Sequence, residues 1–329
     1  MGFSREEDPK VTLFMPTWNA GPEFREIFER MKNQELDRPF EILVIDSGSK
    51  DGTVEFLKEQ GVRLIQISNK EFNHGLTRNR GIQEARGEIV VLATQDAKPY
   101  DEHWMQRLVD CYDDPEVAGA YSRQLPRPDA NPFIKDRLSS WAAAKEEPRV
   151  QKIQNREEFE ALPPLEKLGR VAFDNVSSSV RKSIATEIPF RERQFGEDLD
   201  WGHRVILAGH KIVFEPRSKV IHSHNNSIWY EFKRVYLDHQ NLNRIFGVHT
   251  IPRWKDVFSC SWHALGHLAK VVSRDQDLGL PGKLWWWAKV PFYGFSQNLA
   301  QFLGARSVRK LNEGSKWYRR IDRKLRRGV

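Results

Sequence analysis

The first 125 residues alternate short apolar runs with segments of helical spacing. The apolar runs are unbroken by polar residues, and between them apolar residues recur three or four positions apart, as at 24, 27, 28 and 31. Continuous apolar strands separated by helices predict an α/β fold with a mainly parallel, Rossmann-like sheet covered by helices on both faces. We expect strands over 11–16, 40–48, 63–68, 88–94 and 117–124, and helices over 21–34, 51–61, 74–87 and 102–114.

The pattern changes after residue 125. Prolines at 126, 128, 132, 148, 163 and 164 interrupt it, so we expect a long loop or insertion over 125–170 with one short helix near 138–146. Regular structure is expected to return over 171–187, 195–216 (a helix and then a strand) and 219–225 (a further strand).

The last third of the chain is helical in pattern and rich in aromatic residues. We therefore expect a domain over 1–225, with halves at about 10–125 and 126–225, and a helical region over 226–329.

Composition narrows the class of protein. Hydrophobic residues make up 39% of the 329 residues and charged residues 29%, which is typical of a soluble globular chain. A net charge of +7 favours anionic partners: phosphates, anionic lipid or nucleic acid. Two cysteines exclude a disulfide framework and a zinc cluster. With no apolar signal segment and no run near the ~18 residues of a spanning helix, we expect a cytoplasmic protein.

Polar side chains follow the expected strands at their carboxyl ends, where a parallel sheet places its ligand site. No Gly-rich dinucleotide fingerprint and no GxxxxGK[ST] loop is present, which disfavours a dehydrogenase or a P-loop NTPase. Asp46 is a candidate for contacts to a base or ribose, but Asp46 and Asp51 are equally suited to organising a turn and capping a helix. The strand-end residues are Pro16, Thr17, Asn19, Asp46, Ser47, Asp51, Asn73, Gly75, Gln95 and Asp96.

Asp96 is also a candidate metal ligand. A carboxylate beside a diphosphate suits Mg²⁺ or Mn²⁺, and His222 and His224, two apart on an expected strand, would face the same way. The alternative is a turn-forming aspartate and two structural histidines.

Glu197 and Asp198 stand at the start of an expected helix. They suit helix capping, or one of them suits a general base whose pKa is raised by the crowding of acids. Arg78, near the start of the third helix, suits a phosphate contact, although arginines are more often solvated.

Four segments together resemble glycosyltransferase family 2, the inverting enzymes of GT-A fold. VTLFMPTWNAG is similar to the opening strand of that family, and EILVIDSGSKDGT to its nucleotide-binding strand and turn. FNHGLTRNRGIQEARGEIVVLATQDA is similar to the segment ending in the D-x-D motif, and FGEDLDWGHRVILAGHKIVFEP to the segment with the acceptor-activating acids. The resemblance covers about 10–225. In place of D-x-D the chain has Thr94-Gln95-Asp96, which lacks the first acid.

FNHGLTRN, TQDA and SRQLPRPDANP resemble the rhamnosyltransferase branch, whose donor is dTDP-rhamnose. The resemblance implies that the strand-end residues bind the donor nucleoside, with Arg78 assisting at the diphosphate. It implies a divalent cation on Asp96 with His222 or His224. Asp198, or else Glu197, would deprotonate a hydroxyl of a glycan or lipid-linked acceptor, giving an α-linked product with inversion. Asn175 and Trp201 would line the acceptor pocket.

The end of the chain is basic. Between Arg306 and Arg327, ten Lys and Arg residues face two acids, and Trp317, Ile321 and Leu325 are four residues apart. With the tryptophans at 285–287, this suits a helix on an anionic membrane surface, peripheral to the inner face of the cell membrane. The alternative is a solvated basic tail that packs on the protein.

Three other functions compete with this interpretation. A transferase of the same fold with a UDP-sugar donor cannot be distinguished by pattern. A nucleotidyltransferase would have a Gly-rich, basic loop after the first strand, where this chain has PTWNAGPE. A non-enzymatic lipid- or nucleic-acid-binding protein would leave the strand-end residues unexplained, so we expect no nucleic-acid partner.

Overall fold

The computed structural model describes residues 8–328, and the contacts within the chain divide it into two compact units. The first unit comprises the chain up to Arg127, Leu138–Leu162 and Gly169–Ser223, and the second comprises Pro128–Arg137, Pro163–Leu168 and the chain from His224 onward. This division lies close to the boundary expected near residue 225. The limits of the functional domains stay a prediction.

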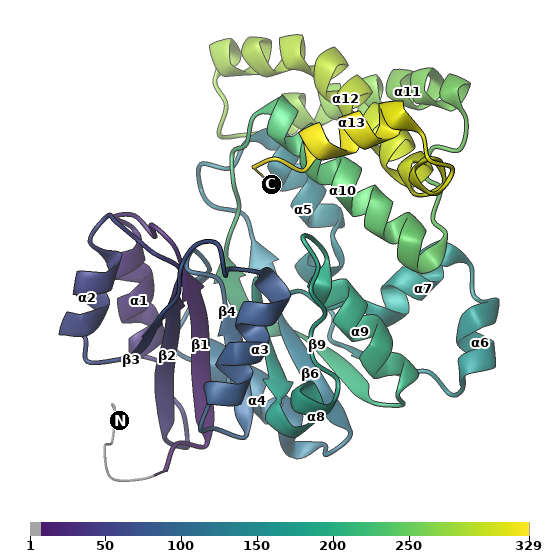
Figure 1. Cartoon of the computed structure of the whole chain (residues 1–329). Coiled ribbons are helices and arrows are strands. Elements are labelled where there is room, and N and C mark those ends of the chain that lie inside the picture. The colour runs from purple at the N-terminus through teal and green to yellow at the C-terminus, as the bar shows by residue number, and fades with distance from the viewer. Residues whose placement is uncertain (1–7, 329) are drawn as a thin grey trace. The chain divides into compact units, whose positions relative to one another are not determined.

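A nine-stranded mixed sheet forms the first unit, in the order β3-β2-β1-β4-β8-β6-β9-β5 with β7 paired to β9 (Figure 1). β1 to β4 are parallel neighbours, β8 runs antiparallel between β4 and β6, and β6 and β9 are parallel. The expected α/β fold is therefore confirmed, with an antiparallel strand in the middle of the sheet. The strands are β1 Val11–Thr17, β2 Phe40–Asp46, β3 Arg63–Gln66, β4 Ile89–Ala93, β5 Lys98–Pro99, β6 Val117–Leu125, β7 Arg149–Gln151, β8 Ser177–Arg181 and β9 Lys211–Ile221.

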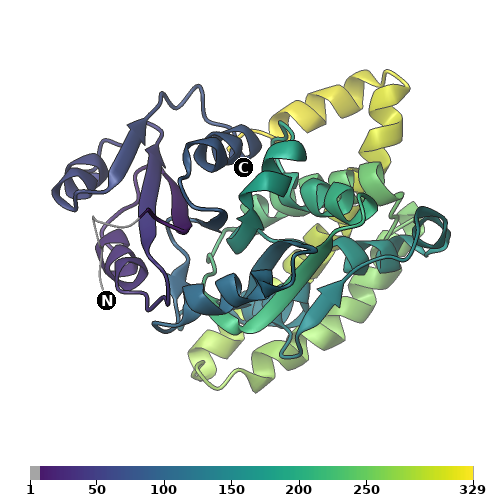
Figure 2. The ribbon, with the colours of Figure 1, turned by 90° about the horizontal axis from the view of Figure 1, so that it is seen from below.

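Helices cover both faces of this sheet (Figures 1 and 2). On one face, Phe28 of α1 and Trp104 of α4 pack in a single core with Leu13 of β1. On the other face, Phe14 lies against Gly81 of α3, which is close enough that a Cβ would meet the ring at 2.4 Å. The helices of this region are α1 Phe24–Lys32, α2 Thr53–Glu59, α3 His74–Glu84, α4 Trp104–Asp110, α8 Lys182–Glu187 and α9 Glu197–Leu207.

The segment expected to be a loop over 125–170 contains regular structure instead. The helix expected near 138–146 begins earlier, as α5 Pro132–Ser140, and is followed by β7, α6 Arg156–Ala161 and α7 Pro164–Val171. Two prolines that suggested interruption are the first residues of α5 and α7, a position where the missing N–H costs nothing. The Asn131 side chain caps α5 by accepting from the amides of Phe133 and Ile134 at 3.1 Å.

The strands expected around 216 and over 219–225 are one strand, β9. Its pairing with β6 shifts register between Ser122 and Arg123, where a bulge accommodates the intervening residues. β9 ends at Ile221. The expectation that His222 and His224 lie on a strand is therefore wrong, because both follow its last residue.

The second unit contains four long helices, α10 Ile228–Phe246, α11 Trp254–Arg274, α12 Leu280–Asn312 and α13 Lys316–Leu325. Val272 of α11 and Val290 of α12 share a core with Phe133 of α5. α13 lies on α10, where the Tyr236 hydroxyl donates to Asp322 at 3.1 Å. Among the described residues, no helix combines the length and apolar character needed to cross a membrane.

Candidate active site

The carboxyl ends of β1 and β2 are tied together by Asp46. Its carboxylate accepts from the Thr17 hydroxyl at 2.8 Å, from the Ser49 hydroxyl at 2.5 Å, and from the amides of Gly48 and Ser49 at 2.9 Å. The side chain is fully buried. Ser47 closes the same turn by donating its amide and its hydroxyl to the Thr17 carbonyl. Asp46 therefore organises the turn, the alternative that the sequence left open.

Asn19 and Asp51 join the two loops above this turn. The Asn19 side chain accepts from the Lys50 amide at 2.8 Å, and Asn19 itself has a φ of 43°, a left-handed conformation that asparagine tolerates. Asp51 accepts from the amide of Gly21 and from Thr53. Burial alone would raise the pKa of Asp51, but these hydrogen bonds outweigh it and lower the pKa. The two loops thus form one hydrogen-bonded platform.

Pro16 in β1 and Gln95 after β4, two further residues predicted for the site, also have defined partners. Pro16 pairs with Ile45 in the β1–β2 ladder. Gln95, after β4, accepts from the Trp18 amide at 2.8 Å and donates to the Trp18 carbonyl at 3.2 Å, so it fixes the end of β4 against the loop after β1. This contact places Asp96 next to the platform formed by the first two loops.

Asp96, His222 and His224 form the one group among the described residues whose candidate ligand atoms lie close enough together to hold a metal ion. One ligand atom from each lies within 4.8 Å of the others, and the Nε2 atom of His222 is 3.6 Å from an Asp96 carboxylate oxygen. Asp96 comes from the turn after β4. The two histidines come from the segment directly after β9, with His224 one residue past the end of the first unit. The three candidate ligands predicted from sequence are therefore brought together.

Two residues that the sequence analysis did not single out hold His222. Its Nδ1 atom is 3.2 Å from the Gln124 side-chain oxygen, and the Gln124 amide donates to Asp174 at 2.7 Å. Asp174 also accepts from the indole N–H of Trp141 at 3.1 Å. With Nδ1 donating to Gln124, the Nε2 atom of His222 is left as an acceptor directed at Asp96, the tautomer that a metal ligand requires.

The acids predicted at the start of α9 occupy different environments. Glu197 is buried and pairs with Arg78 at 3.0 Å. Asp198 is half-buried and accepts from the amides of Leu199 at 2.8 Å and Asn175 at 3.3 Å. Burial, then the negative charges of Glu197 and Asp174, raise the pKa of Asp198 to about 8. Of the two acids, Asp198 is therefore the one whose pKa is raised, whereas Glu197 is held in an ion pair with Arg78.

Arg78 was expected at the donor phosphates. In the structure it is buried, and its guanidinium donates to Glu197, to the His74 carbonyl at 3.0 Å and to the Asn175 carbonyl at 3.4 Å. These contacts tie α3 to α9 and to the segment before β8. Arg78 therefore holds Glu197 in place, and its contact with the donor phosphates stays a prediction.

Asn73 and Gly75 attach α3 to the segment that leads into α9. Asn73 caps the helix by accepting from the amides of Gly75 and Leu76, and it donates to the Arg193 carbonyl at 3.2 Å. A Cβ on Gly75 would come within 2.4 Å of the Arg191 carbonyl oxygen. Glycine is required there for close packing, which explains its position independently of any ligand.

The two predicted acceptor residues have different positions. Trp201 is fully buried, stacks on Phe190 at 5.2 Å and donates its indole N–H to the Ile188 carbonyl. It is a core residue, so the expectation that it lines the acceptor pocket is corrected. Asn175 is 2% exposed and adjoins Asp198, and its Nδ2 atom is buried without a hydrogen-bond partner. A buried amide of this kind is a donor available to a ligand.

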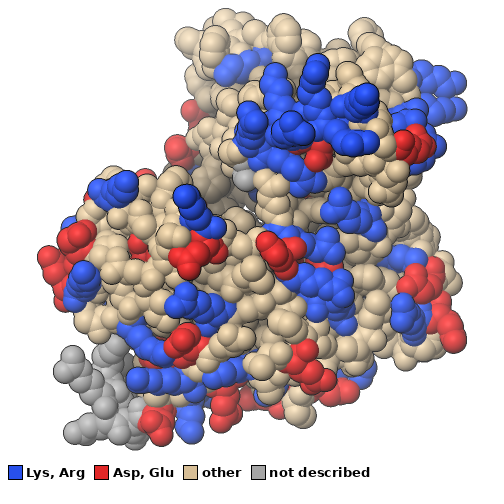
Figure 3. All heavy atoms as spheres, viewed as in Figure 1, with Lys and Arg blue, Asp and Glu red and all other residues tan. Residues whose placement is uncertain are grey.

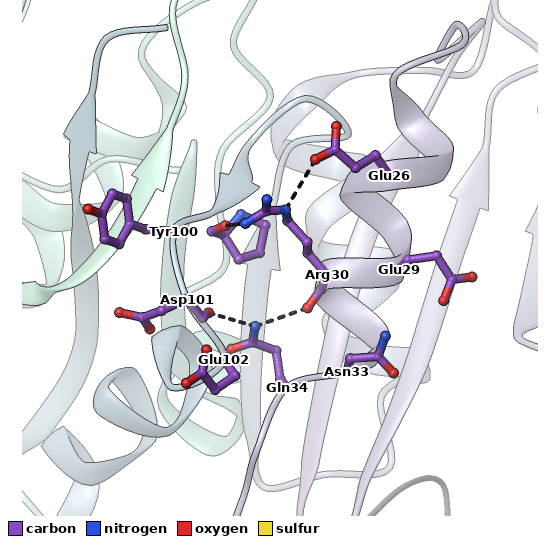
Figure 4. A pocket seen from close by; sticks show the side chains of 9 residues that line it. Glu26, Glu29, Arg30, Asn33, Gln34, Tyr100, Asp101 and Glu102 are labelled. Carbon is purple, nitrogen blue, oxygen red and sulfur yellow. Dashed lines mark hydrogen bonds and ion pairs between the residues drawn. The ribbon is translucent and has the colours of Figure 1, made fainter. Parts of the chain in front are cut away.

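A separate pocket of about 430 Å³ lies between α1 and the segment after β5 (Figure 4). Arg30 pairs there with Glu26, and Gln34 donates to the carbonyls of Arg30 and Asp101. Its other lining residues include Glu29 and further acids. None of the residues predicted for the site lines this pocket, and its acidic lining does not suit a diphosphate.

The sequence contained a signal for one of the two residues that were missed, Gln124, and none for Asp174. Gln124 is the polar residue near the carboxyl end of β6, and the rule applied to the first four strands selects it as well. Asp174 immediately precedes Asn175, but it belongs to no strand and carries no distinctive pattern. Its role becomes visible only through its contacts with Gln124 and Trp141.

Comparison with known proteins adds to this geometry. Residues 12–166 match the family described as glycosyl transferase family 2. The chain is 32% identical over 235 residues to the O-antigen chain rhamnosyltransferase RfbN of Salmonella typhimurium, covering 69% of this chain and 70% of that protein. It is 32% identical over 236 residues to the O-antigen chain rhamnosyltransferase WbaN of Salmonella anatum, with the same coverage.

Two solved structures share the fold. A mannosyltransferase from Pyrobaculum calidifontis, in complex with GDP-Man and Mn²⁺, has a TM-score of 0.51 at 17% identity over 97% of this chain and 85% of that chain. Residues 1–349 of TarS from S. aureus, in complex with UDP-GlcNAc, have a TM-score of 0.50 at 14% identity over 93% of this chain and 92% of that chain. Both likenesses are evidence of the GT-A fold.

Proposed function

The chain belongs to glycosyl transferase family 2, and on that premise we propose that it transfers L-rhamnose from dTDP-β-L-rhamnose to a hydroxyl of a glycan or lipid-linked glycan, with inversion. The choice of rhamnose is supported by the two O-antigen rhamnosyltransferases to which it is similar. The observation that carries the proposal is one network of contacts. It runs from the Asp96 and His222 cluster through Gln124 and Asp174 to the neighbourhood of Asp198.

The donor nucleoside would lie on the platform formed by the loops after β1 and β2. Thr17, Asn19, Asp46, Ser47 and Asp51 build this platform through mutual hydrogen bonds, so its shape is set before the donor arrives. A preformed site loses less entropy on binding. The other residues of the proposed donor site come from β1, from α3 and its cap, and from the turn after β4: Pro16, Asn73, Gly75, Arg78 and Gln95.

Asp96, His222 and His224 would hold Mg²⁺ or Mn²⁺. One carboxylate and two imidazoles fit this assignment, since Mn²⁺ accepts imidazole together with carboxylate. When bound, the cation supplies positive charge against the departing diphosphate. Gln124 and Asp174 fix the ring of His222, and Gln95 fixes the loop that carries Asp96.

Asp198 would act as the base, with Glu197 held in its ion pair with Arg78. The acceptor oxygen attacks the anomeric carbon from the side opposite the diphosphate, and the bond from that carbon to the diphosphate oxygen breaks. Because the attack comes from the opposite side, a β-linked donor gives an α-rhamnoside. The acceptor proton moves to the Asp198 carboxylate. The free amide of Asn175, next to Asp198, would donate to the acceptor.

A lipid-linked acceptor places this reaction at a membrane surface. We propose that the protein is cytoplasmic and peripheral on the inner face of the cell membrane, since the relatives to which it is similar are O-antigen rhamnosyltransferases and the chain carries a net charge of +7.

The experiment that tests this function is a calorimetric titration of the chain with dTDP-rhamnose, dTDP, UDP and UDP-glucose, each with Mn²⁺, Mg²⁺ or EDTA. We expect metal-dependent binding that prefers the thymidine ligands. A preference for UDP would keep the transferase and replace the donor. Absence of nucleotide binding under every condition would contradict the site.

Matched histidine variants sharpen this titration. His222→Gln removes one of the three candidate ligands, and His210→Gln changes a half-buried histidine in the turn after α9. We expect only the first variant to lose the difference between Mn²⁺ and EDTA. Equal metal dependence in both variants would remove His222 from the site.

A further inference from the structure

Helices α11 and α12 of the second unit carry large apolar side chains that remain exposed. Trp262 is 75% exposed, Phe292 71% and Trp285 61%. Surfaces of this kind mark interaction sites, because soluble proteins rarely expose contiguous apolar patches without a use. We call the whole set the aromatic face: Trp254, Phe258, Trp262, Leu280, Leu284, Trp285, Trp287 and Phe292.

The aromatic face runs across both helices. Trp254, Phe258 and Trp262 are four residues apart and so share one side of α11. The ring of Phe258 packs against Phe295 of α12 with centroids 5.8 Å apart. Further along, the indole N–H of Trp287 donates to the Ala269 carbonyl of α11 at 3.2 Å. These contacts join the exposed side chains of the two helices into one surface.

The contacts of the aromatic face between the two helices use only part of its side chains. The side chains that pack the pair are buried ones, among them Val257, Leu268, Val272 and Val290, each at most 6% exposed. The exposed residues are additional to this core. Their apolar area is therefore available to something outside the chain.

The charges along α12 are of one sign, whereas on α11 Asp256 lies between Trp254 and Phe258 and pairs with Arg253. No Asp or Glu occurs between residues 278 and 312, whereas the chain as a whole has 45 acids in 329 residues. The same stretch has five cations, and Lys289 lies over the rings of Trp285 and Trp286 at 4.3 and 4.4 Å. The five cations are Lys283, Lys289, Arg306, Arg309 and Lys310.

α13 adds positive charge in the same unit. Figure 3 shows Lys and Arg side chains gathered over this helix. The apolar stripe expected there is used within the protein at one end, because Leu325 is only 3% exposed, while Trp317 remains 57% exposed. α13 is thus a cationic element packed on α10. The stripe of Trp317, Ile321 and Leu325 predicted from sequence is not the main exposed apolar surface of the second unit.

We propose that the aromatic face of α11 and α12 docks the protein on an anionic lipid bilayer, with its tryptophan and phenylalanine rings in the interfacial region. Aromatic rings prefer that region, and lysine and arginine beside them contact anionic headgroups. The stretch 278–312 contains no Asp or Glu that a negatively charged lipid surface would repel. The proposal does not depend on the donor or on the metal.

The test is flotation of the full chain with vesicles of phosphatidylcholine containing phosphatidylglycerol, compared with phosphatidylcholine alone. We expect binding to the anionic vesicles that weakens as salt rises. Trp262→Ser combined with Phe292→Ser should reduce the bound fraction at least about ten-fold, since both side chains would lose their burial in lipid.

The matched control is Val150→Ser combined with Leu165→Ser, which removes two apolar side chains of similar exposure, 62% and 60%, that belong to neither α11 nor α12. We expect this control to bind as the unchanged chain does. Thermal melting of both variants checks that each is folded. Quenching of tryptophan fluorescence in the unchanged chain by brominated lipid gives a measurement that needs no variant, and we expect quenching.

Three outcomes would overturn the proposal. One is failure of the unchanged chain to float with anionic vesicles. Another is equal flotation of the aromatic-face variant and the unchanged chain, which would assign binding to the cations of α13 alone. The third is a dimer in solution that the aromatic-face variant converts to a monomer, together with no vesicle binding, which would assign the face to a second copy of this chain.

Discussion

At the scale of single residues, Asp198 presents a conflict between its environment and its proposed task. A base must be deprotonated, but burial and the charges of Glu197 and Asp174 raise the pKa of Asp198 to about 8. We therefore expect kcat/KM for transfer to rise as the pH increases from about 6 to about 8, because the deprotonated fraction of the base increases over that range. The measurement is a pH profile at saturating cation. A rate that is constant across this range would contradict the assignment.

The raised pKa of Asp198 also affects stability. Its contribution to the free energy of unfolding falls as the pH rises, whereas its contribution to transfer increases. Because the pKa in the folded chain lies above the ordinary value of 3.8, protonated Asp198 favours folding, and this contribution is lost as the pH rises through about 8. Asp198→Asn removes the ionisation. We expect the variant to lose nearly all transfer, to keep donor binding and to melt at no lower temperature than the unchanged chain at pH 8.5.

Asp200→Asn, on the same helix, provides the contrast. Asp200 is buried and pairs with Arg193 at 2.5 Å and Arg204 at 3.0 Å, so its neutral variant leaves two cations without their partner. We expect this variant to melt at a lower temperature.

Near-normal transfer by Asp198→Asn would remove Asp198 as the base.

The residues of the site differ in how far sequence could identify them. Asp96 and His222 have side chains that suit cations, and their meeting was predicted, although the strand expected beneath the histidines ends at Ile221. Gln124 was overlooked because the strand-end rule, which did select Gln95, was applied only to the first four strands. Trp201 was misplaced because residue type does not reveal burial, and a tryptophan suits a sugar pocket and a core equally well.

At the scale of elements, α3 positions the acids through close contact with the segment 190–193. Asn79 exchanges two hydrogen bonds with the backbone of Phe190, and Asn73 donates to Arg193. Gly75 has no room for a Cβ, which would lie 2.4 Å from the Arg191 carbonyl oxygen. The register between α3 and α9 depends on this contact, and so does the pairing of Arg78 with Glu197.

Gly75→Ala should therefore separate α3 from this segment. Overpacking against backbone costs about 1–3 kcal/mol, and we expect a loss of unfolding free energy in that range together with reduced transfer. Denaturant unfolding measures the first and a product assay the second. Gly169→Ala in α7 is the control, because nothing lies within 4 Å of a Cβ there, and it should be neutral or slightly stabilising. Equal stability of the two variants would show that the contact at Gly75 is unimportant.

The elements of the first 125 residues were predictable because buried strands there are continuous apolar runs. A helix and then a strand were also expected over 195–216, where α9 and β9 lie, but most of the elements within 125–170 and the strand β8 were not predictable, for two physical reasons. Proline interrupts a helix in its interior but starts one at its first position, as Pro132 and Pro164 do, so the same residue has opposite meanings. The antiparallel strand β8 has the sequence SSSVR, whose three serines carry little apolar signal although all are buried.

At the scale of the whole molecule, the two ends of the proposed reaction involve different kinds of surface. The first unit holds a network of fixed polar contacts suited to a nucleotide sugar. The second unit combines an apolar surface with cations and suits a lipid environment. A transferase that uses a lipid-linked acceptor needs both. This division explains why the +7 charge does not require a nucleic-acid partner.

The proposed metal site should also contribute to the stability of the first unit. Asp96 lies in the turn between β4 and β5, and His222 directly follows β9, so a cation on both would strengthen the junction where β5 pairs with β9. A ligand present at 100 times its Kd and bound to the folded state alone stabilises it by about 2.7 kcal/mol. We therefore expect Mn²⁺ to raise the melting temperature by several degrees and EDTA to reverse the rise. The measurement is thermal unfolding, and His222→Gln should abolish the effect while His210→Gln retains it. A rise of equal size in both variants would place the bound cation elsewhere.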